Sequence, residues 1–150
     1  MNIDIVLYFH ILSATAWIGG SLLLFALGII LRDKEAQKQV YFYLGPIYGY
    51  FETFWLILLW ITGLSLFVNF GFYELLRYDP DHVLSHWMQH KLIYVSVITI
   101  LTFIHMIIAF KTHNSNRSFI LTLISRGSSL LIFFLNLGIL WVAIQIRNIL

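Results

Sequence analysis

Residues 5–31 read IVLYFHILSATAWIGGSLLLFALGIIL, a run without a single Asp, Glu, Lys or Arg. A helix needs about 20 mostly apolar residues to cross the hydrocarbon core of a bilayer. Three later runs are equally free of these residues: 53–73, 92–110 and 127–146. The sequence therefore predicts four transmembrane helices, because each run is long enough to span a membrane and the polar links are too short for a soluble domain.

Composition supports this interpretation and excludes other classes of protein. The chain is 60% hydrophobic and 11% charged, whereas soluble domains carry about 25% charged residues. A membrane β-barrel would need many short alternating segments, and these runs are continuous. We therefore predict an all-α, integral membrane four-helix bundle that forms one domain, residues 1–150. Its helices are expected at approximately 3–31, 47–72, 86–111 and 121–147.

The chain has no cysteine, which limits the cofactors it can hold. Thiolate zinc sites, iron–sulfur ligation and thioether-linked haem are excluded, so any haem would be held non-covalently. Any transition metal would need His, Met or carboxylate ligands. The net charge of +2 is too small to indicate a nucleic-acid partner.

The positions of the basic residues predict the orientation of the bundle. Lys and Arg favour cytoplasmic loops, and here they gather in the first and third links. Those links contain Arg32, Lys34, Lys38, Lys111, Arg117 and Arg126. The second link contains Arg77 and the C-terminal tail Arg147. Both termini are therefore expected to lie outside the cytoplasm.

This orientation places the ionisable residues of the helices in two layers. The outer layer contains His10, His86, His90 and Lys91. The inner layer contains Glu52, His105, Lys111 and Arg126. Ionisable residues inside a membrane are costly and usually face the bundle interior or a cavity, so each is a functional hypothesis. The alternative for a histidine is a neutral imidazole that hydrogen bonds to a neighbouring helix.

One face of the first helix combines a histidine with small residues. At 100° per residue, this face contains His10, Ala14, Trp17, Ser21 and Gly28. Small side chains beside an imidazole leave room for a flat macrocycle, which suits a haem pocket in a helical bundle. The same small residues also permit close helix packing without any cofactor.

A second histidine pattern begins before the third helix. In residues 79–91, DPDHVLSHWMQHK, a histidine recurs every four residues at His82, His86 and His90, with Met88 between the last two. In a helix this spacing places three imidazoles on one face, and His at i and i+4 can chelate a metal. Such ligands suit copper or zinc. The alternative is a partly solvated segment at the lipid headgroups.

The polar residues of the inner layer also allow two interpretations. Glu52 and Arg126 lie on the same side of the membrane and are expected to pair or to extend to the interface. Alternatively, Arg126, Arg117 or Lys111 holds the propionates of an inner haem, for which His105 is the histidine that this layer offers within a helix. Asn136 lies in the middle of the last helix and is expected to hydrogen bond to another helix.

Two segments resemble known families of small membrane proteins. FHILSATAWIGG (residues 9–20) resembles the H-x6-W-x-G-G pattern that opens the HemJ-type protoporphyrinogen oxidases and the related CopD-type copper resistance proteins. WMQHKLIYVSVITILTFIH (residues 87–105) continues the HemJ-type resemblance, with an aromatic residue, a lysine and a histidine one helix-length later. The last helix departs from the family's R-x-x-N-E-x-P motif, because SRGSSLLIFF (residues 125–134) retains only Arg126.

The HemJ-type resemblance implies a four-helix bundle of the bacterial inner membrane that binds haem b and oxidises protoporphyrinogen IX. It implies that His10 is a haem ligand and Lys91 a functional cation. It also implies that Trp17 lines the pocket and that His105 is a further polar residue of the site. The CopD-type resemblance implies copper binding or copper transport instead.

We therefore expect a redox protein with haem b in the outer half of the bundle. His10 is expected as one axial ligand and His90 or His86 as the second, while Lys91 stabilises a propionate or a bound tetrapyrrole. The expected partners are membrane lipid, a tetrapyrrole or an electron-transfer partner, and a second copy of the chain in a homo-oligomer. The alternatives are a small b-type cytochrome and a copper site built from His82, His86, His90 and Met88.

Overall fold

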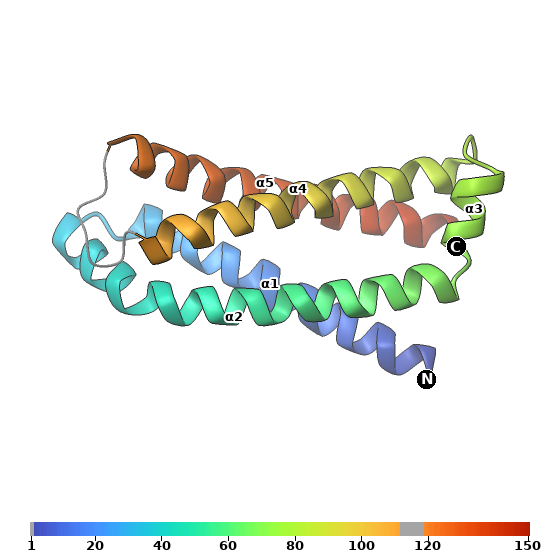
Figure 1. Ribbon diagram of the computed structural model, residues 1–150, viewed down its shortest axis with the longest axis horizontal. Helices are drawn as coiled ribbons and strands as arrows, with labels where there is room; N and C mark the ends of the chain where they lie inside the picture. The colour runs from blue at the N-terminus through green and yellow to red at the C-terminus, as the bar shows by residue number, and fades with distance from the viewer. Residues whose placement is uncertain (1, 112–118) are drawn as a thin grey trace.

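The computed structural model describes residues 2–111 and 119–150, which form five helices. Four of these helices are long: α1 (Ile3–Ile30), α2 (Lys34–Asn69), α4 (Val83–Lys111) and α5 (Phe119–Ile149). The short α3 (Phe72–Tyr78) lies between α2 and α4 (Figure 1). Each long helix contains a stretch that is long and apolar enough to cross a membrane. The predicted fold class, an all-α membrane helical bundle, is therefore confirmed.

The long helices form two antiparallel hairpins that pack side by side (Figure 1). α1 pairs with α2 and α4 pairs with α5, and the hairpins meet where α1 contacts α5 and α2 contacts α4. Both chain termini and α3 lie at one end of the bundle, which we call the terminal end (Figure 1). The α1–α2 connection lies at the other end, which we call the opposite end. Both termini thus share one side of the membrane, and its assignment as the outer side stays a prediction.

α2 begins well before the position that the sequence predicts. The expected start near residue 47 is wrong, because the Asp33 carboxylate caps the helix by accepting hydrogen bonds from the backbone N–H groups of Glu35 and Ala36. Pro46 lies inside the helix rather than at its start. Proline removes a backbone hydrogen bond and kinks helices, and α2 bends in its first third (Figure 1). A helix of 36 residues is about 54 Å long, so its ends extend beyond a hydrocarbon core of about 30 Å.

The sequence does not predict α3, which follows a sharp turn at the terminal end. Gly71 makes this turn with a φ of 70°, a left-handed conformation that glycine adopts without steric cost. The residues that follow bury an apolar cluster formed by α3, α4 and α5. This terminal cluster consists of Phe72, Leu84, Met88, Val142 and Ile146.

The centre of the bundle combines an apolar cluster with a buried amide. The central cluster consists of Trp17, Ile18, Leu56 and Ile98. The Trp17 indole N–H donates to Asn136 Oδ1 (3.2 Å), and Asn136 Nδ2 donates to Ser21 Oγ (2.9 Å). Asn136 is 2% exposed. Its expected hydrogen bond to another helix is therefore confirmed, and the two bonds join α1 to α5.

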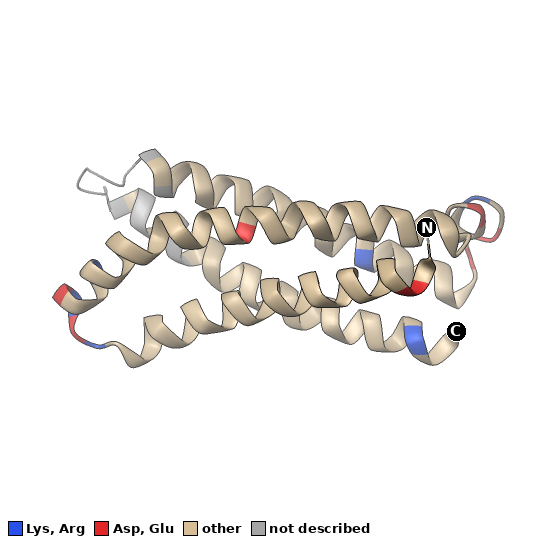
Figure 2. Cartoon of the chain, turned by 90° about the horizontal axis from the view of Figure 1, so that it is seen from below, with Lys and Arg blue, Asp and Glu red and all other residues tan. Residues whose placement is uncertain are grey.

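Charge is distributed as expected for a bundle whose middle lies in lipid. Many large apolar side chains are exposed along the helices, and the charged residues gather mainly at the two ends of the bundle (Figure 2). Glu52 and Lys91 depart from this pattern, because each lies within a long helix away from the connections. Glu52 is buried and Lys91 is half-buried. Both are therefore candidate functional residues in the interior of the bundle.

Candidate functional site

His10 joins α1 to α2 in the half of the bundle next to the terminal end. Its Nδ1 lies 2.9 Å from Thr62 Oγ1. The ring packs against Gly63, where an added Cβ would lie only 3.2 Å from His10 Cε1. A side chain at position 63 would therefore require the imidazole to shift by a few tenths of an ångström. The sequence Thr62-Gly63 thus offers a hydroxyl next to a position with room for a ring.

The hydroxyl of Thr62 favours one of the two neutral tautomers of the His10 ring. Thr62 Oγ1 donates to the carbonyl of Leu58, one turn earlier in α2, at 2.7 Å. Its proton is thus already used, which favours the tautomer in which the hydroxyl oxygen accepts from His10 Nδ1–H. A neutral imidazole of this form presents Nε2 as an acceptor. Histidines ligate metals in this way, with the second ring nitrogen held by a hydrogen bond.

Lys91 belongs to the same neighbourhood. It is close enough to His10 to interact with it electrostatically, and it is half-buried on α4. It makes no hydrogen bond or ion pair with any residue that the structure describes. A buried charge is costly unless it is paired. A cation beside a neutral imidazole therefore favours an anionic ligand.

His86 and His90 have other surroundings. Both are exposed. His90 Nδ1 donates to the backbone carbonyl of His86 (2.7 Å), and its ring lies beside Trp87 and Tyr94, with centroids 6.0 and 6.5 Å apart. Neither His86 nor His90 makes a hydrogen bond or a ring contact with His10. The structure thus shows no contact that would favour either residue as a second axial ligand.

The residues expected to bind copper do not gather around one point. His82 precedes α4, and its Nδ1 accepts a hydrogen bond from the backbone N–H of Leu84 (3.1 Å). Met88 is buried in the terminal cluster, whereas His82, His86 and His90 are exposed. In the described part of the chain, no group of three His, Cys, Asp or Glu side chains is placed to hold a metal ion.

Trp17 lies in the central cluster, about two turns along α1 from His10. It is 3% exposed, and its indole N–H is engaged by Asn136. In the structure this side chain therefore connects α1 to α5 through packing and a hydrogen bond. Its role as a residue of a cofactor pocket stays a prediction.

Glu52 lies near the middle of α2. The expected helix start near residue 47 would place Glu52 close to the beginning of the helix, but α2 already begins at Lys34. Glu52 is 8% exposed and makes no hydrogen bond or ion pair with the residues that the structure describes. The side chain of Arg126, its expected partner, lies outside the described residues. Glu52 is thus a buried carboxyl in a membrane helix without an observed partner.

The other polar residues of the inner layer face different neighbours. His105 Nδ1 faces α5, at 3.3 Å from Ser128 Oγ and 3.4 Å from Ser129 Oγ. Thr102, one turn earlier in α4, is 4% exposed, and its hydroxyl has no hydrogen-bond partner among the described residues. The same holds for the buried indole N–H of Trp55 on α2. The Thr102 hydroxyl and the Trp55 indole N–H are therefore buried polar groups without a hydrogen-bond partner in the described part of the chain.

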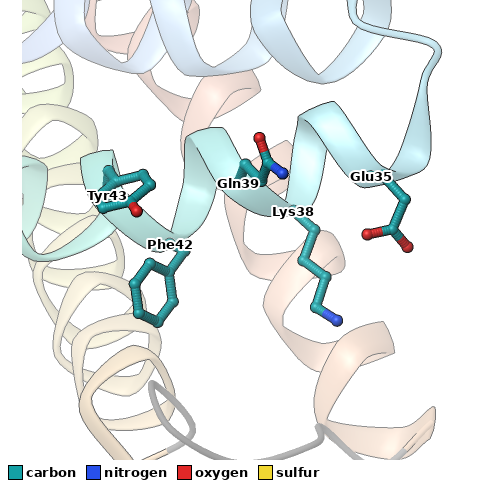
Figure 3. A pocket seen from close by; sticks show the side chains of 5 residues that line it. All are labelled: Glu35, Lys38, Gln39, Phe42 and Tyr43. Atoms are coloured by element: carbon teal, nitrogen blue, oxygen red, sulfur yellow. The ribbon is translucent and has the colours of Figure 1, made fainter.

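A shallow hollow of about 400 Å³ lies on the first third of α2, near the opposite end and far from His10. Figure 3 shows its lining: Glu35, Lys38, Gln39, Phe42 and Tyr43. All five residues belong to one helix, and Lys38 and Phe42 extend to the same side of it (Figure 3). Because no second element contributes a side chain among the residues that the structure describes, this hollow does not resemble a built ligand site.

Thr62 and Gly63 are absent from the site that the sequence predicts. Their signal is weak, because a threonine followed by a glycine in an apolar run is also an ordinary packing pair. Their importance depends on the pairing of α1 with α2, which places them against His10.

No family model, curated protein or solved structure matches the chain. Any assignment of function therefore depends on the geometry of the site. The likeness to HemJ-type and CopD-type proteins therefore stays a prediction from two sequence segments. The candidate site consists of His10, Thr62, Gly63 and Lys91.

Proposed function

We propose that the chain is an integral membrane protein that binds haem b non-covalently and has a redox role. The hydrogen bond between His10 and Thr62 carries this proposal, because it leaves Nε2 of a half-buried imidazole available as a metal ligand. His10 would be the residue that holds the haem iron, and Thr62 would orient its imidazole. His86 and His90 are not assigned as ligands, because both are exposed.

Lys91 supports the proposal through electrostatics. Haem carries propionate groups, and a lysine is a compact cation that pairs readily with such anions. Lys91 lies within electrostatic range of His10 and lacks a partner among the described residues. The donor set therefore fits haem b: a neutral imidazole, a cation for a propionate and apolar surroundings on three helices.

Each residue of the site has a separate task. A bound haem supplies one-electron redox chemistry, whereas the chain supplies ligation, burial and charge. Thr62 keeps the proton on Nδ1 of His10, which makes Nε2 a better electron donor. Gly63 leaves the space that the imidazole occupies. The HemJ-type resemblance identifies protoporphyrinogen IX as the first compound to test for oxidation, with a membrane electron carrier as the acceptor.

The proposal is tested with the full-length protein purified in detergent. Absorbance spectra are recorded before and after reduction with dithionite, and iron and copper are measured in the same sample. His10→Ala removes the proposed ligand, and His90→Ala is the matched control because its histidine is exposed. Circular dichroism checks that both variants remain helical.

We expect the wild-type protein and His90→Ala to show a Soret band and sharp reduced α and β bands. His10→Ala should lose these bands while it stays folded. A wild-type protein that contains no haem and takes up none when haem is added would contradict the proposal. A His10→Ala variant with the wild-type spectrum would refute the assignment of the ligand.

A further inference from the structure

A polar stripe connects Glu52 with the opposite end of the bundle. At 100° per residue, the polar residues of this stripe lie within an arc of about 60° on α2. They are Gln37, Tyr41, Tyr48 and Glu52. Gln37 Nε2 donates to the carbonyl oxygens of Gly28 and Leu31 (3.3 and 3.5 Å), so the stripe begins at the α1–α2 connection.

Two glycines of α1 accommodate the tyrosines of this stripe. An added Cβ at Gly28 would lie 3.2 Å from the Tyr41 hydroxyl, and one at Gly20 would lie 3.0 Å from the Tyr48 hydroxyl. Both hydroxyl groups therefore lie against the backbone of α1, with Tyr48 half-buried and Tyr41 exposed near the opposite end. Tyr48 is also close enough to Glu52 to interact with it electrostatically.

Glu52 is the last residue of the stripe, and it lies farthest from the opposite end of the bundle. Tyr48 faces Gly20 on one side of it, and Thr62 faces His10 on the other. The carboxyl therefore lies between two levels that are both within the apolar span of α1. A carboxylate at this depth costs several kcal/mol unless it finds a partner, and the described residues provide none.

Thr102 supplies a second unsatisfied polar group on the helix that faces α2. The Thr53 hydroxyl contacts Met106 Sδ (3.4 Å), and Trp60 Nε1 donates to the Thr99 hydroxyl (3.0 Å). These two contacts set the register between the helices and place Thr102 about one and a half turns from the level of Glu52. Its hydroxyl is buried and without a partner among the described residues.

Few titratable groups face Glu52 from the helices packed on α2. α1 has none between residues 11 and 31. On α4, His105 turns toward the serines of α5, and the side chain of Lys111 is not described. The titratable residues of α3 lie far from Glu52, because α3 is at the terminal end (Figure 1). Among the described side chains, Tyr48 is therefore the titratable neighbour that connects Glu52 with the rest of the stripe.

We propose that Glu52 is a proton-binding site within the membrane-spanning part of the bundle, and that the hydroxyl groups of Tyr48 and Tyr41 give protons access to it from the opposite end. Tyr41 and Tyr48 are about 10 Å apart along the helix axis, so water molecules complete the path between them. The proton is the ligand, and it moves on and off the carboxyl without any redox step. This proposal does not depend on haem binding.

Infrared spectroscopy of the full-length protein in lipid vesicles tests the proposal. The C=O stretch of a protonated carboxyl is separate from the amide bands and shifts when water is replaced by D₂O. Glu52→Gln should remove this band, whereas Glu35→Gln, at the exposed start of α2, should not. Glutamate labelled with ¹³C identifies the band in the unmodified protein, which keeps the test valid if Glu52→Gln does not fold.

The rate of the deuterium shift tests the path. Tyr48→Phe should slow the exchange of the Glu52 proton about tenfold, the effect of losing one hydrogen-bonded step. Tyr43→Phe is the matched control, because Tyr43 is 71% exposed and lies outside the stripe. The absence of a glutamic acid band would refute the proton site. An exchange rate unchanged by Tyr48→Phe would refute the path.

Discussion

Replacing Asn136 with leucine tests how the two hairpins are held together in the membrane. The substitution removes both hydrogen bonds between Asn136 and α1, one from the Trp17 indole (3.2 Å) and one to Ser21 (2.9 Å). Leucine has the same branched skeleton of side-chain heavy atoms as asparagine and a larger volume, so the change leaves no cavity. Interhelical hydrogen bonds in membranes contribute about 0.6 kcal/mol on average and up to about 1.7. We therefore expect a loss of about 1–3 kcal/mol in the free energy of unfolding.

Reversible unfolding in mixed micelles, followed by circular dichroism and by the fluorescence of buried tryptophans, measures this loss. Asn69→Leu is the matched control, because the Asn69 amide is exposed and donates within its own helix, to the Ser65 carbonyl and hydroxyl oxygens. The control should change stability by less than about 0.5 kcal/mol. If Asn136→Leu unfolds like the wild-type protein, the hydrogen bonds do not stabilise the α1–α5 contact and this reasoning fails.

Three further substitutions address the candidate site and the α1–α2 interface. Thr62→Val should weaken haem binding by about 10- to 100-fold in a titration of the apoprotein, while Thr62→Ser should not; equal affinities would contradict the role of Thr62. Lys91→Gln should abolish any preference for haem over its dimethyl ester in the same titration, and a retained preference would place the propionate contact elsewhere. Gly20→Ala should cost about 1–3 kcal/mol in unfolding experiments, because its Cβ would lie 2.9 Å from the Tyr48 ring. Gly19→Ala, with nothing within 4 Å, should cost much less, and equal losses would contradict the packing argument.

The membrane fold can be read from the sequence because lipid imposes a simple rule on length and polarity. The run at 5–31 predicts a spanning helix, and α1 extends from Ile3 to Ile30. The start of α2 is harder, since Pro46 suggests a helix start while Asp33 caps the helix earlier. The first residue of α2 depends on whether the Asp33 cap or Pro46 marks the helix start. The pattern of apolar residues does not distinguish between them.

The candidate site is only partly predictable, because it depends on which helices pair. Depth along the helices predicts that His10 and Lys91 share a layer, and the structure places them within electrostatic range. His90 is next to Lys91 in sequence but about 100° away around the helix, so one residue is half-buried and the other exposed. Thr62 becomes a site residue only through the pairing of α1 with α2, which no sequence pattern reveals.

The most direct test of the central claim is chemical rescue of the ligand. His10→Gly removes the imidazole and leaves a space beside Gly63 that free imidazole can enter. The account predicts that this variant is purified without haem, and that added haem produces a b-type spectrum only when imidazole is also present. A His10→Gly variant that binds haem equally well without imidazole, or one that remains without haem when imidazole is added, would contradict the claim that His10 ligates haem.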